Sequence, residues 1–281
     1  METSVLQDAA RFIAEADTIF IGAGAGMGVD SGLPDFRGKE GFWRAYPVFR
    51  KLRYSFEDMA NPTWFFRDPE QAWGFYGHRL NTYRLIKPHA GFGILRKWME
   101  EKPLPGFVLT SNVDGHFQKA GFSGEQIYEC HGSIHWLQSY NDSKGEIWSA
   151  DEVEIKVDTE TCRALSDLPL CPGTGEIARP NILMFGDYMW NSRRSTEQGE
   201  RLRDWLSDAG HLKGVIIEIG AGKAVPTVRL NCERFAENLG FPLIRINLQD
   251  ADGPPDTCSI DAGAMEVLVQ IDEILSEEFY G

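Results

Sequence analysis

A glycine-rich segment, residues 24–28, is the first part of the sequence whose residue types suggest chemistry. It follows an apolar run at residues 18–21, which predicts a buried parallel strand, and it precedes a plausible helix. Backbone N–H groups at such a junction can converge on a phosphate. The third glycine of the usual dinucleotide fingerprint would fall on Val29, so the glycines alone are equally compatible with a tight turn that binds no ligand.

Two further segments carry polar groups next to expected strands. Asn112 and Asp114 follow the apolar run that begins at Phe107, although an Asx-turn after a strand would explain them at least as well. A histidine has an unperturbed pKa near ~6.5 and can accept a proton from a hydroxyl, so His131 could act as a general base. For a histidine taken alone a structural role is favoured, and His78, His89, His116, His135 and His211 are expected to be surface or hydrogen-bonded structural residues.

Alternating strands and helices must position these segments. A first helix is predicted from residue 4 to residue 13, and further helices at residues 91–100, 195–209, 228–239 and 264–275. Buried strands are predicted at residues 107–109, 182–185, 215–219 and 243–246. Such alternation implies right-handed βαβ crossovers, so we expect an α/β fold with a Rossmann-like, doubly wound parallel sheet and a smaller inserted domain.

Two stretches interrupt this alternation. Residues 39–87 are dense in aromatic side chains and predict a compact helical insertion. Residues 135–178 are polar and rich in turn residues, and they predict a second, looser insertion that forms the small domain. The main domain is therefore expected to comprise residues 1–38, 88–134 and 179–281.

Composition narrows the class of protein. The chain has 281 residues and a formal net charge of −14 without a Lys/Arg-rich run, so we expect no direct binding to nucleic acid. Its five cysteines are odd in number and scattered, which does not indicate a disulfide framework and favours a reducing cytoplasm. Neither a secretion signal nor a membrane span is predicted. The sequence leaves the oligomeric state open.

The continuation of the glycine segment is more specific. It runs through Ser31 and Gly32 to Pro34-Asp35-Phe36-Arg37, and it resembles the first signature of the sirtuin family. The segments Thr110-Ser111-Asn112-Val113-Asp114 and His131-Gly132-Ser133 resemble the family's next two signatures. Gly28 replaces a serine of the first signature, and Ser111 replaces a glutamine of the second.

The resemblance implies the sirtuin fold, NAD as cofactor and removal of acyl groups from protein lysine side chains. The acyl oxygen would attack the nicotinamide ribose and release nicotinamide, and His131 would then take a ribose hydroxyl proton so that the acyl group moves to the sugar. Asn112 and Asp114 would complete the catalytic set. The implied cofactor contacts are Gly24, Ala25, Gly26, Ser31, Asp35, Phe36, Arg37, Ser111, Asn112, Val113, Asp114, Gly220, Ala221, Gly222, Asn247 and Ala264.

The same resemblance implies where an acylated-lysine protein or peptide binds. The segment from Arg179 to Gly186 is similar to the strand on which sirtuins pair an extended substrate peptide, with Ile182, Phe185 and Gly186 as candidate contacts. Tyr76 and Arg79 share a helix face and resemble the pair that binds the carboxylate of succinyl- or malonyl-lysine in desuccinylase-type sirtuins. Packing for the tyrosine and a solvated surface charge for the arginine are equally plausible roles.

One departure from the family concerns its structural metal. Sirtuins usually carry four cysteines that bind zinc in the small domain, whereas residues 135–178 contain only Cys162 and Cys171. Two thiolates do not complete a tetrahedral site, so no zinc is expected. Two alternative functions remain open: transfer of ADP-ribose to protein or hydrolysis of NAD by the same site, and a non-catalytic NAD or ADP-ribose sensor.

Overall fold

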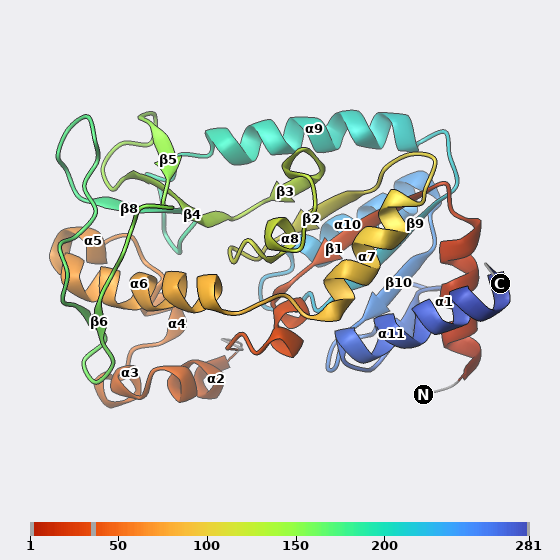
Figure 1. Ribbon diagram of the computed structural model, residues 1–281, viewed down its shortest axis with the longest axis horizontal. Coiled ribbons are helices and arrows are strands. Elements are labelled where there is room, and N and C mark those ends of the chain that lie inside the picture. Colours follow the sequence, from red (N-terminus) through yellow and green to blue (C-terminus); the bar gives the residue numbers. More distant parts are fainter. Residues whose placement is uncertain (1–2, 35–37, 280–281) are drawn as a thin grey trace.

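The computed structural model describes residues 3–34 and 38–279 of the chain. Its centre is a parallel sheet in the strand order β11-β10-β9-β1-β2-β3 (Figure 1). The strands are β1 (Thr18–Ala23), β2 (Phe107–Thr110), β3 (Ile127–Glu129), β9 (Gly214–Ile219), β10 (Leu243–Ile246) and β11 (Cys258–Ile260). Because all pairings are parallel, the carboxyl ends of the strands share one edge. The predicted Rossmann-like α/β fold is confirmed.

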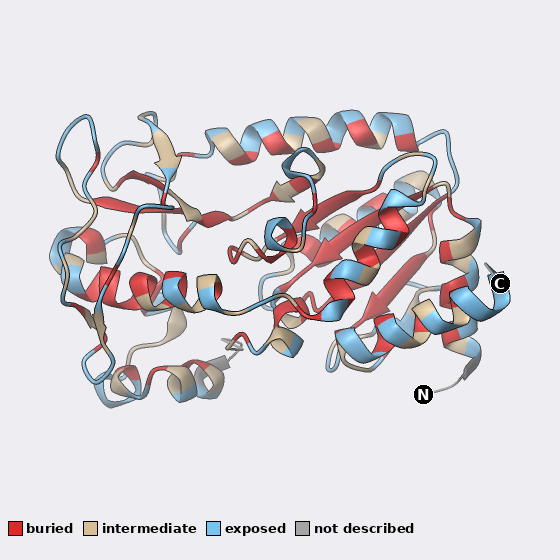
Figure 2. Cartoon of the chain, viewed as in Figure 1, coloured by how far each residue is buried: buried red, intermediate tan, exposed pale blue. Residues whose placement is uncertain are grey.

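Alternate side chains of the strands enter two hydrophobic clusters. Ile19 and Ile21 of β1 pack with the helices on one face, which are α1 (Thr3–Glu15), α7 (Ala90–Glu100) and α11 (Ala264–Ile274). Phe20 packs on the other face, against α9 (Arg193–Ala209) and α10 (Thr227–Leu239). Figure 2 shows the strands buried and the outer helix surfaces exposed. Burial on both faces explains why these strands are continuous apolar runs.

The inserted segments form a third hydrophobic cluster at the other end of the molecule (Figure 1). Its helices are α2 (Gly38–Ala45), α3 (Pro47–Leu52), α4 (Phe56–Met59), α5 (Trp64–Arg67) and α6 (Pro69–Leu85). Its strands are β4 (Gly132–Ser139), β5 (Ile147–Ser149) and β8 (Ala178–Ile182) in an antiparallel sheet, with β6 (Val157–Asp158) and β7 (Arg163–Ala164) as a separate pair. Both inserted segments therefore share one core.

Short turns complete the chain. The glycine segment after β1 continues into the 3₁₀ helix η1 (Ala25–Ser31), α8 (His116–Lys119) follows β2, and η2 (Gly124–Gln126) precedes β3. The last described residues, Leu275–Phe279, form a π-helical turn. Within the described ranges, no helix is both long enough and apolar enough to cross a membrane.

One predicted strand is wrong. The apolar run 182–185 was expected to belong to the parallel sheet, but β8 covers Ala178–Ile182 and pairs antiparallel with β4. Asp187 explains where the strand ends, because its carboxylate accepts the N–H groups of Met184 and Met189 and so folds the following residues into a turn. Short strands β3 and β11 carry too few residues for a periodic signal and were not predicted.

Candidate functional site

The strand order creates a switch point between β1 and β9. The chain adds β2 and β3 on one side of β1 and later returns to add β9, β10 and β11 on the other side. Ligands of doubly wound sheets bind in the crevice outside the carboxyl ends of the strands at such a point. Two glycine-containing turns lie there, residues 24–26 after β1 and residues 220–222 after β9.

The two glycine turns contact each other through their backbones. The Gly24 N–H donates to the Ile219 carbonyl oxygen at 2.9 Å, and the Gly26 N–H donates to the Gly220 carbonyl oxygen at 3.0 Å. Gly220 has a φ of 62°, and a Cβ there would lie 2.4 Å from the Gly26 Cα. Glycine is therefore required for the turns to meet, and these two N–H groups are used within the protein instead of facing a ligand.

The outer surface of the turns is open. Ala25 is exposed, and a Cβ at Gly222 would meet no atom of the described residues within 4 Å. Ala221 is buried, and its carbonyl oxygen accepts the Asn247 Nδ2 at 2.9 Å. Because these two positions are open among the described residues, the site fits a dinucleotide whose pyrophosphate approaches the backbone closely.

Asn112 connects the end of β2 to the first glycine turn. Its Nδ2 donates to the Gly24 carbonyl oxygen at 2.9 Å, and the neighbouring Ser111 N–H donates to the Ala23 carbonyl oxygen at 3.2 Å. The Thr110 hydroxyl also donates to Ala23 and accepts the Asn112 N–H, each at 3.0 Å. Asn112 is thus held beside the glycine turn, as a cofactor contact there requires.

His131 lies between the end of β3 and the start of β4, and the backbone around it is held on both sides. Gly132 has a φ of 76°, and a Cβ there would lie 2.0 Å from the Asn181 carbonyl oxygen. The His131 carbonyl oxygen accepts the Leu183 N–H at 3.0 Å. Burial lowers the pKa of His131, against an opposing hydrogen bond with the Ser111 backbone. The imidazole is therefore neutral at pH ~7, the form that accepts a proton.

Asp114 is buried next to strand β4, which begins directly after His131. Burial raises its pKa to about 6, although the His116 N–H donates to the Asp114 Oδ1 at 2.9 Å and opposes the shift. Asp114 is consequently a carboxyl group that gains or loses a proton near neutral pH, and Val113 beside it is buried as well. His135, which the sequence predicts to be a surface or hydrogen-bonded structural histidine, contacts the Asp114 carbonyl oxygen through Nε2 at 2.9 Å.

Helix α6 brings Tyr76 and Arg79 together in the inserted core. The Arg79 guanidinium carbon lies 5.7 Å from the centre of the Tyr76 ring, and its Nε and Nη2 donate to the Tyr83 hydroxyl at 3.1 and 2.9 Å. The Tyr76 hydroxyl is buried without a hydrogen-bond partner among the described residues, and burial raises its pKa to about 12. Tyr83 was missed by the sequence analysis, although its i+4 spacing from Arg79 is a usable signal.

The candidate peptide contacts differ in exposure. Ile182 is buried in the inserted core, whereas 41% of Phe185 is exposed. The Phe185 ring centre lies 6.2 Å from that of Phe56, and the Arg79 guanidinium carbon lies 5.6 Å from the same Phe56 ring. Gly186 adopts a φ of 65°. The segment after β8 is thus connected to the Tyr76 and Arg79 cluster through Phe56.

Three other candidate cofactor residues have structural roles. The Ser31 hydroxyl accepts the His89 N–H at 3.0 Å, at the start of α7. Asn247 Oδ1 accepts backbone N–H groups of the turn after β10. Ala264 is buried at the first position of α11. The candidates Asp35, Phe36 and Arg37 lie outside the described residues.

The small domain is held to α6 by direct contacts. Arg163 forms a bidentate ion pair with Asp68 at 2.8 and 2.9 Å, and the Trp73 Nε1 donates to the Ala178 carbonyl oxygen at 2.9 Å. Cys162 and Cys171 are both buried. Across residues 3–34 and 38–279, no group of three or more His, Cys, Asp or Glu side chains is arranged to hold a metal ion.

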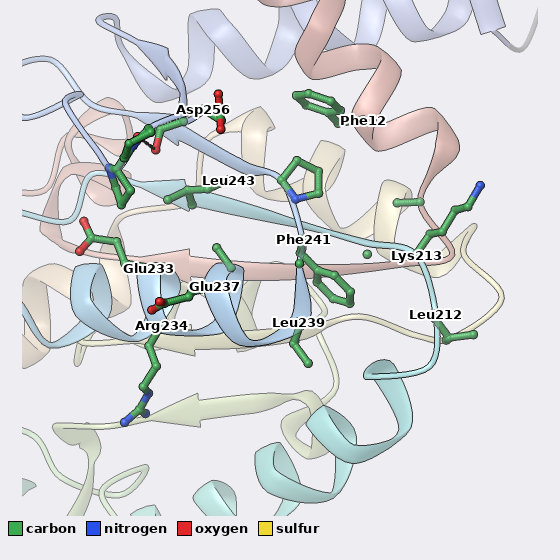
Figure 3. Close-up of a pocket in the computed structure, with 18 of the residues that line it drawn as sticks. Phe12, Leu212, Lys213, Glu233, Arg234, Glu237, Leu239, Phe241, Leu243 and Asp256 are labelled. Atoms are coloured by element: carbon green, nitrogen blue, oxygen red, sulfur yellow. Dashed lines mark hydrogen bonds between the residues drawn. The ribbon is translucent and has the colours of Figure 1, made fainter.

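A groove of about 1140 Å³ opens away from this site (Figure 3). It is lined by residues at the amino ends of the strands, such as Gly214 and Leu243, by the last turn of α1 and by one side of α10 from Leu230 to Leu239. The glycine turns and His131 lie at the carboxyl ends instead. The groove is therefore separate from the candidate active site, and the geometry at the switch point is the better guide to function.

A doubly wound sheet with two glycine turns at its switch point is typical of α/β proteins that bind a nucleotide. In this chain Asn112 bonds the first of these turns, and His131 bonds the backbone of the adjacent Ser111. Comparison with known proteins makes this specific. The model of the Sir2 family matches residues 24–205. A relative from Pyrococcus furiosus, named "NAD-dependent protein deacylase", is 30% identical over 184 residues, which are 65% of this chain and 66% of the relative.

A second relative of the same name, from Aeropyrum pernix, is 28% identical over 240 residues, covering 85% of this chain and 84% of the relative. The match to the Pyrococcus furiosus protein spans just under two thirds of that protein's length. Among solved structures, a Sir2 homologue–NAD complex is similar with a TM-score of 0.73 at 24% identity, covering 96% of this chain and 93% of that chain. This chain belongs to the Sir2 family.

Proposed function

We propose that this chain removes acyl groups from lysine side chains of proteins in a reaction that consumes NAD, releasing nicotinamide and an O-acyl-ADP-ribose. The observation that carries the proposal lies beside the glycine turn after β1, close to the switch point: Asn112 donates to the Gly24 carbonyl oxygen, and His131 bonds the backbone of the adjacent Ser111. A sensor that only binds NAD has no need of a histidine held in its neutral form beside the site.

When bound, NAD supplies an electrophilic ribose carbon with nicotinamide as its leaving group. The residues of this chain bind and orient the reactants. Asn112 is held over the first glycine turn, on the side of β1 that carries β2 and β3, where it would order the nicotinamide ribose. Asp114 and Val113 would hold the carboxamide. His131 would accept the proton of a ribose hydroxyl at the ring nitrogen that does not bond the Ser111 backbone.

The adenosine half of the cofactor would be held on the β9 and β10 side, because the groups that carry the chemistry lie on the opposite side of β1. The turn 220–222 and Asn247 lie on that side and would bind the nucleotide through backbone groups. Asp35, Phe36 and Arg37 complete the proposed cofactor set, together with Ser31 at the end of η1 and Ala264 at the start of α11.

For the acyl group, we propose a preference for acids such as succinyl and malonyl. Tyr76 has a buried hydroxyl without a partner among the described residues, and a carboxylate oxygen is an acceptor for it. Arg79 is oriented by the Tyr83 hydroxyl, which leaves the guanidinium beside the Tyr76 ring. An arginine fork binds a carboxylate with two parallel hydrogen bonds. The peptide itself would lie along residues 182–186.

The test is incubation with NAD and matched acetyl-, succinyl- and malonyl-lysine peptides, following nicotinamide release and the acyl product by mass spectrometry. We expect O-acyl-ADP-ribose, with a higher kcat/KM for the acidic acyl groups. His131→Ala should abolish the acyl product, whereas His211→Ala, at an exposed position, is the matched control. Nicotinamide release without acyl-ADP-ribose would overturn the proposal in favour of ADP-ribosyl transfer or NAD hydrolysis.

We further propose the cytoplasm as the location, because all five cysteines are free in this structure. The cofactor set is NAD without zinc, since the small domain is held by ion pairs and buried side chains. The proposed domain limits follow the three hydrophobic clusters, with residues 39–87 and 135–178 as the insertions.

A further inference from the structure

The segment that carries Asp114 is fastened to strand β4 at two successive residues. The Ile134 N–H donates to the Val113 carbonyl oxygen at 3.0 Å. The His135 Nε2 lies 2.9 Å from the Asp114 carbonyl oxygen. A carbonyl oxygen can only accept, so Nε2 carries the hydrogen and donates it. Burial lowers the pKa of His135, so the ring is neutral and this is its tautomer.

The imidazole of His135 also occupies space that a side chain at residue 115 would need. Gly115 has a φ of 71°, and a Cβ there would lie 2.7 Å from the His135 Cδ2 and 2.9 Å from its Nε2. His135 is itself held on β4, because its carbonyl oxygen accepts the Ala150 N–H at 2.9 Å. The left-handed turn after Asp114 and the histidine ring therefore fit each other.

These contacts couple two parts of the candidate site. Strand β4 begins at Gly132, directly after His131. The strand that follows His131 therefore also holds the backbone of Asp114. We propose that His135 is a positioning residue that fixes Asp114 for recognition of the nicotinamide carboxamide, and this inference rests on the proposed function of the site. His135 acts through Asp114 and does not contact the reacting atoms.

Two substitutions separate the hydrogen bond from the packing. His135→Gln keeps an N–H donor on a flexible side chain, whereas His135→Phe keeps an aromatic ring of similar size and removes the donor. A neutral hydrogen bond contributes about 1 kcal/mol, which is about a fivefold change in an equilibrium constant. We expect His135→Phe to weaken NAD binding and nicotinamide inhibition about fivefold, with the KM for the acyl peptide unchanged, and His135→Gln to recover most of the loss.

The measurements are the dissociation constant of NAD by calorimetry, inhibition by nicotinamide, the KM of both substrates and the melting temperature. Calorimetry needs no turnover, so it tests the positioning role even if the chain proves not to be a deacylase. Unchanged NAD and nicotinamide affinities in folded His135→Phe would overturn the inference. The inference would also be overturned if His135→Phe and His135→Gln both weakened the binding of NAD and of the acyl peptide to the same extent. Such a result would mean that His135 has only a general structural role. His211→Ala again serves as the exposed control.

Discussion

Alanine at Gly220 is expected to destabilise the protein far more than alanine at Gly222, although both glycines belong to one turn. At Gly220 the added Cβ would lie 2.4 Å from the Gly26 Cα and 2.5 Å from the Met27 nitrogen. Both are backbone atoms, and ordinary contact begins at 3.4 Å, so the two glycine turns must separate. At Gly222 the Cβ would meet nothing within 4 Å.

The magnitude follows from two contributions. The left-handed φ of 62° at Gly220 costs alanine about 1–2 kcal/mol, and loss of the Gly26 to Gly220 hydrogen bond costs about 1 kcal/mol more. A total of about 2–3 kcal/mol lowers the melting temperature by roughly 4–12 °C in a chain of this size. Gly222→Ala should remain within about 0.5 kcal/mol of the parent.

Thermal unfolding followed by circular dichroism, with the parent and both variants in one buffer, measures this difference. The two turns also form the proposed cofactor site, so the comparison is made without NAD to keep binding out of the measured stability. Equal melting temperatures for Gly220→Ala and Gly222→Ala would refute the argument that backbone contact between the turns requires glycine at residue 220.

Four further outcomes are expected. Asp114→Asn should flatten the pH dependence of stability between about pH 4 and 6. Burial raises the pKa of Asp114 in the folded chain to about 6, against ~3.9 in the unfolded chain. The stability that Asp114 contributes is therefore fully present below the unfolded pKa and is lost as the pH rises through 6. Thermal unfolding at several pH values checks this, and an unchanged profile would contradict it. Arg179→Met leaves the Asp187 carboxylate buried without its ion-pair partner and should cost about 3–5 kcal/mol in urea denaturation. Arg179→Met with Asp187→Leu should recover part of that loss, and a double variant no more stable than the single one would argue against the explanation. Tyr76→Phe should leave stability within about 1 kcal/mol, since its hydroxyl has no described partner, while lowering the ratio of succinyl to acetyl kcat/KM. A chelator should not change the melting temperature, and about one zinc per chain by metal analysis would contradict this.

The sequence predicted the main sheet because its strands are buried on both faces. The runs at residues 18–21, 107–109, 215–219 and 243–246 all lie within observed strands. The run at 182–185 failed, because a short apolar run does not specify the sheet to which a strand belongs. The sheet that this segment joins depends on the buried ion pair between Arg179 and Asp187, because Asp187 also accepts the Met184 N–H and ends the strand just after β8.

For the site, the sequence identified residue types but not their contacts. His135 and Tyr83 were not singled out, because their roles depend on the Asp114 carbonyl oxygen and on the Arg79 guanidinium. Gly24 and Gly26 were expected to offer N–H groups to a phosphate, whereas both N–H groups donate to the β9 side of the switch point. The acceptors, the carbonyl oxygens of Ile219 and Gly220, lie almost two hundred residues further along the chain, so a local sequence pattern cannot predict them.

The sequence by itself determined the family, through signatures in the correct order, and it identified the residues on which the proposed chemistry rests: a histidine, an amide and a carboxyl in segments that follow the glycine turn along the chain. Each signature is a short run of consecutive residues, so it can be recognised in a single sequence without knowledge of the fold. Only the tertiary structure decided which glycines are required for backbone contact, which histidine supports Asp114 and which hydroxyl orients Arg79. Those roles arise from packing between distant segments, and the spacing of residues along the chain does not encode them.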